Sequence, residues 1–159
     1  MTLEDTLLQR LADFGPQDSG RQTITVSDDE TGWSVALTID RNDNLSSAIW
    51  EMIERSPRPL SDAGLSLKTW AEKVAGQVRG LLEPLCVVEI DDTRDEALLR
   101  SDEPTARKSD RYYYEVLLKG AGQAEVRRFK GTTERGKRQQ IPFTLTHETV
   151  AKLAGDLAF

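Results

Sequence analysis

Oxygen-bearing side chains with the spacing of a calcium loop form the sharpest chemical pattern in the chain. Asp40, Asn42 and Asn44 occupy positions 1, 3 and 5 of a twelve-residue segment that ends at Glu51, and these are positions from which such a loop supplies ligands. The sixth position of a calcium loop needs glycine for its sharp turn, and here it is Leu45. The pattern therefore favours a strand-to-helix turn held by Asp and Asn hydrogen bonds, and we predict no metal site.

The other residues capable of catalysis do not form a recognisable set. His147, the single histidine, has no second histidine or neighbouring cysteine with which to hold zinc. Asp91 and Asp92 follow a strand-like run, and an enzyme that used them with His147 would need the three groups within about 10 Å of one another. Residues 120–122 lack the third glycine of a phosphate loop, and no Gly-x-Ser-x-Gly elbow occurs. We therefore predict no catalytic residues, no cofactor and no enzymatic activity.

A basic ribbon between residues 127 and 138 is the strongest indication of binding. Its positive charges are offset within the stretch only by Glu134, and a tyrosine-rich strand lies beside it in the expected hairpin. Arginines on such a ribbon could contact phosphates while aromatic rings stack on bases, although a net charge of −6 argues against a dedicated nucleic-acid protein. The alternative is a solvated hairpin tip that resists aggregation. The candidate binding residues are Arg127, Arg128, Phe129, Lys130, Arg135, Lys137 and Arg138.

The tyrosine-rich strand, residues 111–119, presents two further candidates for binding. Its alternation places Tyr113 and Leu117 on the nominally outer face, opposite the face expected to meet the core. If these two residues are exposed, they mark an interface with an unknown protein partner or in a homodimer, and if a helix covers them, they belong to the core. We therefore predict a non-enzymatic binding or adaptor protein that acts through protein contacts. The alternative is nucleic-acid binding through the basic hairpin 127–138.

Helices that could position these residues are indicated by apolar residues at helical spacing. Three of them follow capping residues, namely Thr2, Ser66 and Thr146. The second of these helices continues to residue 82 and stops because of Pro84. The predicted helices cover residues 3–14, 46–55, 66–82 and 147–157.

Strands are indicated by alternating or continuous apolar runs. The run after Pro84 predicts a strand covered on both faces or nearly so. Phe129 departs from the alternation of the strand that returns from the turn at 120–122, so we expect a β-bulge near Arg127 and Arg128. Pro142 indicates an edge strand, and residues 102–110 form a polar, exposed loop. The run after Pro84 covers residues 85–90, and further predicted strands cover residues 23–27, 33–39, 96–101 and 111–119.

Length and composition bound the architecture. With 159 residues, 38% hydrophobic and 30% charged, the chain fits one α+β domain over residues 1–159, with a subdomain break near 57–64 as the alternative. We predict a largely antiparallel sheet, a meander, with helices packed mainly on one face. No apolar run approaches the roughly 20 residues of a membrane span, and the acidic start does not resemble a signal peptide, so we expect a soluble, cytoplasmic protein without membrane contact. The single Cys86 excludes an internal disulfide.

Several stretches in the last two-thirds of the chain resemble a family of uncharacterised bacterial proteins. The resemblance is carried by residues 65–90, 96–101, 113–118 and 142–148. It includes no catalytic motif and implies no activity for this chain.

Overall fold

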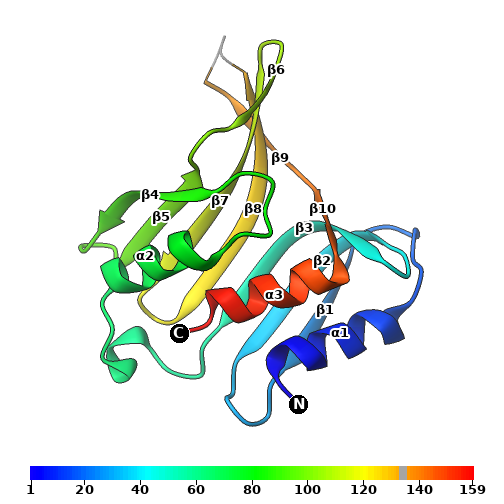
Figure 1. The fold of residues 1–159 in the computed structure, drawn as a ribbon, viewed down its shortest axis with the longest axis horizontal. Helices are drawn as coiled ribbons and strands as arrows, with labels where there is room; N and C mark the ends of the chain where they lie inside the picture. Colours follow the sequence, from blue (N-terminus) through cyan, green and yellow to red (C-terminus); the bar gives the residue numbers. More distant parts are fainter. Residues whose placement is uncertain (133–135) are drawn as a thin grey trace.

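The chain folds as an α+β protein in which the helices lie on one side of a large antiparallel sheet (Figure 1). The computed structural model describes residues 1–132 and 136–159. The predicted fold class is therefore confirmed. The helices are α1 (Leu3–Phe14), α2 (Leu67–Gln77) and α3 (His147–Leu157), with a short 3-10 helix, η1 (Leu60–Ala63).

In the described part of the chain, the strands before residues 57–64 and the strands after them belong to one sheet. Its seven main strands, in spatial order, are β1 (Gln22–Ser27), β2 (Ser34–Asn42), β3 (Ser46–Arg55), β8 (Gln123–Thr132), β7 (Asp110–Lys119), β5 (Glu96–Ser101) and β4 (Leu85–Asp91). Three short strands flank this path: β6 (Thr105–Arg107) pairs with β7, β9 (Arg138–Ile141) with β8, and β10 (Phe143–Thr146) with β3.

The three α-helices begin where their capping residues predicted. Thr2, Ser66 and Thr146 each accept a hydrogen bond from the backbone amide three residues later, which satisfies a free donor of the first turn. Among the described residues, no helix combines the length and apolar character needed to cross a membrane.

The core lies between these helices and one face of the sheet, here called the core face. Trp70 is fully buried there, and its Nε1 donates to the carbonyl of Leu157 at 2.9 Å. The ring of Phe159 meets Trp33 and Trp70 edge-on, with centroid distances of 4.8 and 5.0 Å. The end of the chain is thereby anchored to α2 and to the start of β2.

Residues 46–55, predicted to be a helix, form strand β3. Asp43 caps a hairpin turn rather than a helix, because its Oδ1 accepts from the amides of Leu45 and Ser46, both at 2.7 Å. The register between β2 and β3 shifts at Ile39, and the insertion of Trp50 into the ladder breaks simple alternation. A bulged strand with apolar residues on both faces has the same apparent spacing as a helical stripe, so the helix prediction was wrong.

The predicted central helix and the strand after it also differ from expectation. Helix α2 ends at Gln77, and residues 78–84 cross to β4 without helical structure. Glycine at 76 and 80 weakens the predicted last turns, and a Cβ on Gly80 would lie 2.7 Å from Thr149 Cγ2 of α3. Strand β4 is the edge of the sheet and is half exposed, with Val88 at 49% exposure, so the prediction of cover on both faces was wrong.

Strand β8 contains no bulge where it pairs with β7. The two strands keep an unbroken register from Asp110 opposite Thr132 to Lys119 opposite Gln123, which contradicts the bulge predicted near Arg127 and Arg128. Phe129 does not follow the alternation of Ala124 and Val126 because its side chain lies on the opposite side of the sheet from theirs, where it is paired with Tyr113. The next residue of β8 on the core face after Val126 is therefore Arg128.

Strands β3 and β8 pair over only part of their length, and β9 and β10 fill the remaining space. Direct pairing joins Met52–Arg55 to Gln123–Val126. Beyond these residues, β9 pairs with the second half of β8, and β10 pairs with the first half of β3 (Figure 1). Pro142 lies between β9 and β10 in the sequence. Residues 102–110, predicted to be a loop, contain β6, which lengthens β7 into a hairpin.

Candidate functional site

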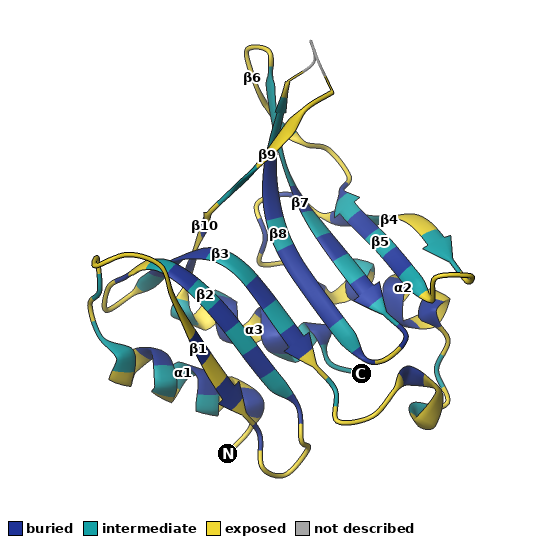
Figure 2. Ribbon diagram, turned by 180° about the vertical axis from the view of Figure 1, so that it is seen from behind, coloured by how far each residue is buried: buried dark blue, intermediate teal, exposed yellow. Residues whose placement is uncertain are grey.

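The face of the sheet opposite the core, here called the outer face, carries no covering helix in the described part of the chain (Figure 2). Tyr113 and Leu117 of β7 lie on it, and both are half-buried. Leu117 lies opposite Leu98 of β5, and Tyr113 stacks on Phe129 with centroids 5.9 Å apart. No helix of the described residues covers Tyr113 and Leu117, and both are half-buried rather than exposed, so their place in an interface stays a prediction.

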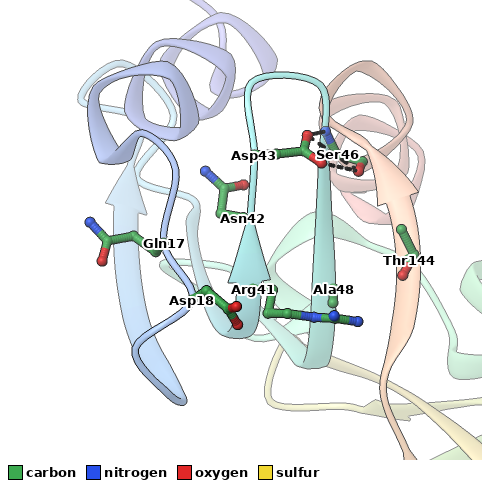
Figure 3. Close-up of a pocket in the computed structure, with 8 residues that line it drawn as sticks. All are labelled: Gln17, Asp18, Arg41, Asn42, Asp43, Ser46, Ala48 and Thr144. Carbon is green, nitrogen blue, oxygen red and sulfur yellow. Dashed lines mark hydrogen bonds between the residues drawn. The ribbon is translucent and has the colours of Figure 1, made fainter.

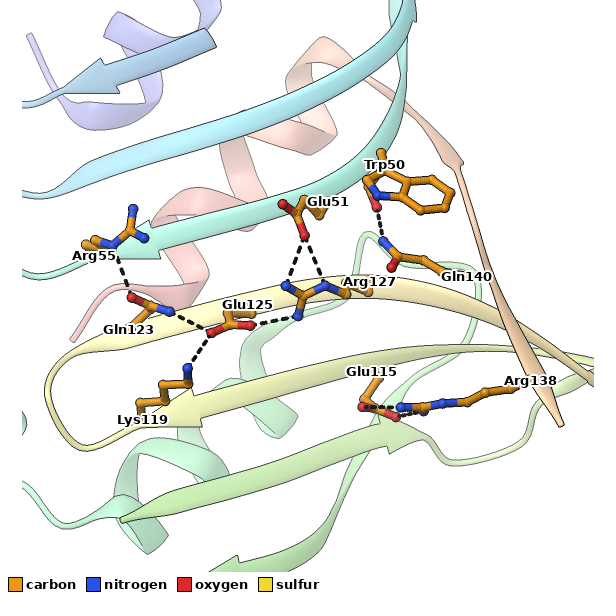
Figure 4. A network of polar contacts seen from close by, with 10 residues as sticks. All are labelled: Trp50, Glu51, Arg55, Glu115, Lys119, Gln123, Glu125, Arg127, Arg138 and Gln140. Carbon is orange, nitrogen blue, oxygen red and sulfur yellow. Dashed lines mark hydrogen bonds and ion pairs between the residues drawn. The ribbon is translucent and has the colours of Figure 1, made fainter. Parts of the chain in front are cut away.

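Arg127 is the centre of an ionic network across three strands of the outer face (Figure 4). Its guanidinium pairs with Glu51 of β3 at 2.9 Å and with Glu125 at 2.7 Å, and Lys119 Nζ contacts the other oxygen of Glu125 at 2.9 Å. Burial alone would raise the pKa of Glu125, but hydrogen bonds from Arg127, Lys119 and Gln123 outweigh it and hold the pKa below its usual value. The network keeps this carboxylate ionised.

A second ionic group on the outer face holds arginines over aromatic rings. Glu115 of β7 accepts from Arg138 of β9, which makes two contacts, and from Arg100 of β5 at 3.1 Å. The Arg138 guanidinium lies 3.9 Å from the Phe129 ring centroid, and that of Arg100 lies 5.8 Å from the Tyr113 centroid. The rings are thus partly covered by cations that are themselves paired.

A third aromatic ring on this face, that of Trp50, is also covered by a paired arginine. The Arg21 guanidinium lies 3.8 Å from its ring centroid and pairs with Asp40 at 2.7 Å. Gln140 of β9 donates to the Trp50 carbonyl at 2.9 Å, which joins the β9 segment to β3 (Figure 4). The outer face therefore presents planar rings set among charges that are neutralised within the chain.

Arg128, the next residue after Arg127, lies on the core face and is 7% exposed. Its two terminal nitrogens each donate to Glu83 at 3.0 Å, and its guanidinium lies 4.3 Å from the Tyr114 ring centroid. Glu83 also accepts from the hydroxyls of Ser101 and Thr105, at 2.7 and 2.6 Å. Burial would raise the pKa of Glu83, but these hydrogen bonds hold it below its usual value. This buried pair ties residues 78–84 to the sheet and is not available to a ligand on the outer face.

The remaining basic candidates that the structure describes lie near the β6–β7 hairpin, where β7 and β8 project from the sheet. Lys130 pairs with Asp110 at 3.6 Å, Lys137 is exposed, and Arg135 lies outside the described residues. The β6–β7 hairpin adjoins the described ends of β8 and β9, and together they extend beyond the body of the protein (Figure 1, Figure 2). The sequence prediction missed the exposed Arg107 and Lys108 of this projection because it assigned them to a loop. We call residues 105–112 together with 130–132 and 136–138 the basic arm.

Of the calcium-like pattern only Asn42 lines a polar hollow of about 340 Å³ beside the β2–β3 turn, whereas Asp40 pairs with Arg21 (Figure 3). Asn42 is buried there, and its Oδ1 contacts Ser47 Oγ at 2.5 Å and His147 Nε2 at 2.9 Å. Hydrogen bonds from the amides of Leu45 and Ser46 lower the pKa of Asp43. Glu51 faces away, toward Arg127, and the described residues contain no cluster of three or more ligands for a metal. The lining residues are Gln17, Asp18, Arg41, Asn42, Asp43, Ser46, Ala48 and Thr144.

Asp91 and Asp92 are not brought together with His147. Asp91 ends β4 at one edge of the sheet, whereas His147 follows β10, which pairs with β3. Four strand intervals separate β4 from β3, a distance of about 19 Å at the usual strand spacing. These three groups therefore do not form a common site.

Comparison with protein-family models, with curated proteins and with solved structures found no match to this chain. The resemblance to a bacterial family stays a prediction.

Proposed function

We propose that this chain is a non-enzymatic binding or adaptor protein that docks another protein on the outer face of its sheet. The single observation that carries the proposal is the position of Tyr113 and Leu117, half-buried on a sheet face that no helix of the described residues covers. Aromatic and arginine side chains are the types most enriched in protein interfaces, and they are concentrated here. A cytoplasmic location stays a prediction from the sequence.

The electrostatics of the outer face also support a protein partner. Arg127 and Arg138 are held by Glu51, Glu125 and Glu115, so their charges are already compensated and their geometry is set before binding. A surface ordered in this way loses little side-chain entropy when a partner docks. It offers hydrogen-bonding groups and rings rather than an uncompensated positive field.

The test replaces Leu117 with lysine and compares capture of partners from native lysate, with and without nuclease. We expect Leu117→Lys to reduce nuclease-resistant capture by at least about tenfold, because it places a charge at the centre of the contact. The matched control is Leu82→Lys, since Leu82 is 71% exposed on the helical side of the sheet. Equal capture by the wild type and the Leu117 variant, or loss only in the Leu82 variant, would contradict the proposal.

Nucleic-acid binding through the basic hairpin 127–138 is the second candidate, and one observation favours it. The β6–β7 hairpin adds Arg107 and Lys108 to the basic arm, which also contains Lys137, and in the described part of the chain none of these three side chains is ion-paired. The pairing of Arg127 and the burial of Arg128 argue against the base of the hairpin as the contact. The candidate contact is therefore the arm tip.

Salt dependence tests this second candidate. If the arm contacts phosphates, binding to a labelled duplex should weaken steeply as salt rises, and replacing Arg107, Lys108 and Lys137 with alanine should remove most of that dependence. Arg127→Ala is the matched control and should leave the salt dependence unchanged. Salt-independent binding, or no binding at low salt, would rule out the nucleic-acid function.

A further inference from the structure

Strand β1 forms an edge of the sheet, and in the described part of the chain no strand pairs with the side of β1 that faces away from β2 (Figure 2). The backbone amide of Asp28 donates to the carbonyl of Trp33 at 2.8 Å, which fixes the alternation of the β1–β2 ladder. The even-numbered residues of β1 therefore direct their amides and carbonyls to β2. Those of Thr23, Thr25 and Ser27 point away from the sheet and are free to pair with an added strand.

This edge lacks the features that usually block the addition of another strand. Residues 22–27 contain no proline and no charged side chain, and their register with β2 has no bulge. The opposite edge strand, β4, differs because its register shifts between Val87 and Glu89 and because it carries acidic side chains. The β1 edge is therefore the one suited to accept an added strand.

Helix α1 forms a groove with this edge, here called the α1–β1 groove. It measures about 360 Å³ and is lined by Gln9 and other side chains of α1, by the exposed Met1 and by residues 25–27. The buried Val26 belongs to this lining and points to the core face, on which α1 lies. Residues directly opposite each other in an antiparallel pair point to the same face. An apolar side chain opposite Val26 would therefore enter the groove.

The charges beyond the end of β1 favour basic residues in the added strand. Asp29 and Glu30 lie in the β1–β2 turn, where both are exposed and neither makes an ion pair within the described residues. The net charge of −6 acts in the same direction. A strand that runs antiparallel to β1 begins beside Ser27, so lysine or arginine at its N-terminal end would lie near this turn.

A free extended segment suits this groove better than a second copy of the chain. In an antiparallel pair of two β1 strands, the core faces of both copies lie on the same side of the joined sheet. The second copy would then bring its own α1 toward the space beside the edge where the first α1 already lines the groove. A segment without a covering helix meets no such obstacle.

We propose that the β1 edge binds an extended, basic segment of a partner protein, which joins the sheet as an antiparallel strand. Main-chain hydrogen bonds to Thr25 and Ser27 supply affinity, and an apolar side chain in the α1–β1 groove supplies specificity. This contact is separate from the docking surface at Tyr113 and Leu117. Four strand intervals, about 19 Å at the usual spacing, separate β1 from β7.

A fluorescent peptide with the sequence Lys-Lys-Thr-Val-Thr-Val-Thr, blocked at both ends, tests the proposal by anisotropy with the purified chain. Its threonines would lie opposite Thr23, Thr25 and Ser27, with their amides directed to β1. Methylating the threonine amides should weaken binding by at least about tenfold, because it removes the donors of the new ladder. Methylating the valine amides, which point away from β1, should change binding by less than about twofold.

Variants of the chain locate the contact. Thr25→Pro removes a donor of the edge at a position where proline is tolerated, and should weaken binding at least about fivefold. Gln9→Trp fills the groove from α1, leaves β1 unchanged and should have a similar effect. Glu30→Lys should weaken binding more than Glu72→Lys, which makes the same change of charge at an exposed position of α2. Thermal melting shows whether each variant folds.

Leu117→Lys should retain the peptide, so failure of the edge contact and failure of the outer-face proposal are distinguishable. Absence of binding between the unmethylated peptide and the wild type would overturn the proposal. Equal effects of the two methylations would overturn it as well, because they show that the peptide does not add as a strand. A wild-type dimer that Thr25→Pro dissociates, seen by sedimentation equilibrium, would assign the edge to a second copy instead.

Discussion

Arg127 and Arg128 are adjacent in the sequence, yet they lie on opposite faces of the sheet and differ in exposure to solvent. Arg127 is partly exposed and pairs with the partly exposed Glu51 and the buried Glu125, whereas both members of the Arg128–Glu83 pair are buried. An exposed ion pair is screened by water, but a buried charge left alone keeps its full desolvation penalty. We therefore expect the outer face to determine recognition and the core face to determine stability.

Breaking the buried pair should have the largest effect on stability. Arg128→Met leaves Glu83 buried without its cation, and we expect a loss of about 3–5 kcal/mol in the free energy of unfolding, measured by denaturant titration. The double variant Arg128→Met with Glu83→Leu removes both charges and should recover much of that loss. A loss below about 1 kcal/mol in the single variant would show that the two faces do not differ in this way.

The next largest change in the free energy of unfolding is expected at Glu54, where substitution should stabilise the protein. It is fully buried on the core face of β3 between Val35 and Ala124, and neither carboxyl oxygen has a hydrogen-bond partner among residues 1–132 and 136–159. Replacing it with methionine should stabilise the protein at neutral pH by about 1–3 kcal/mol, because an unsatisfied buried polar group is removed. Chemical denaturation of both proteins in parallel measures the difference, and a destabilised variant would contradict the expectation.

The pH dependence of the wild type follows from the same residue. Burial raises the pKa of Glu54 well above its usual value in the folded protein. As pH rises above the unfolded pKa, the unfolded chain releases a proton that the folded chain retains, so this residue lowers stability until the folded pKa is passed. Glu54→Met should remove that decline, whereas an unchanged profile of stability against pH would show that Glu54 does not cause it.

The smallest effect is expected on the outer face. Arg127→Ala should cost no more than about 1 kcal/mol of unfolding free energy, because Glu51 is partly exposed and the buried Glu125 keeps its contacts with Lys119 and Gln123. Thermal and denaturant unfolding measure this value against Arg128→Met under identical conditions. A cost comparable to that of the Arg128 variant would mean that the outer network is structural rather than a prepared binding surface.

Local chemistry explains which parts of the fold were predictable. Thr2, Ser66 and Thr146 cap helices as their positions indicated, and the alternation of residues 111–119 matches β7. Residues 46–55 were assigned to the wrong element because a bulge at Trp50 hid the strand period. Of the candidate site, Tyr113 and Leu117 were placed correctly on the outer face, but the burial of Arg128 depends on Glu83, which is 45 residues away in sequence. No local pattern encodes such a partner.

The sequence by itself determined where helices begin, which residues of β7 share a face and the acidic overall charge, because capping and alternation depend on neighbours within a few residues. Only the tertiary structure decided which charges are paired, which strand forms the edge, and that Arg107 and Lys108 join the basic hairpin in one arm. Those outcomes depend on strand pairing between distant segments. The hydrophobic core sets that pairing by selecting which face of each strand the helices cover.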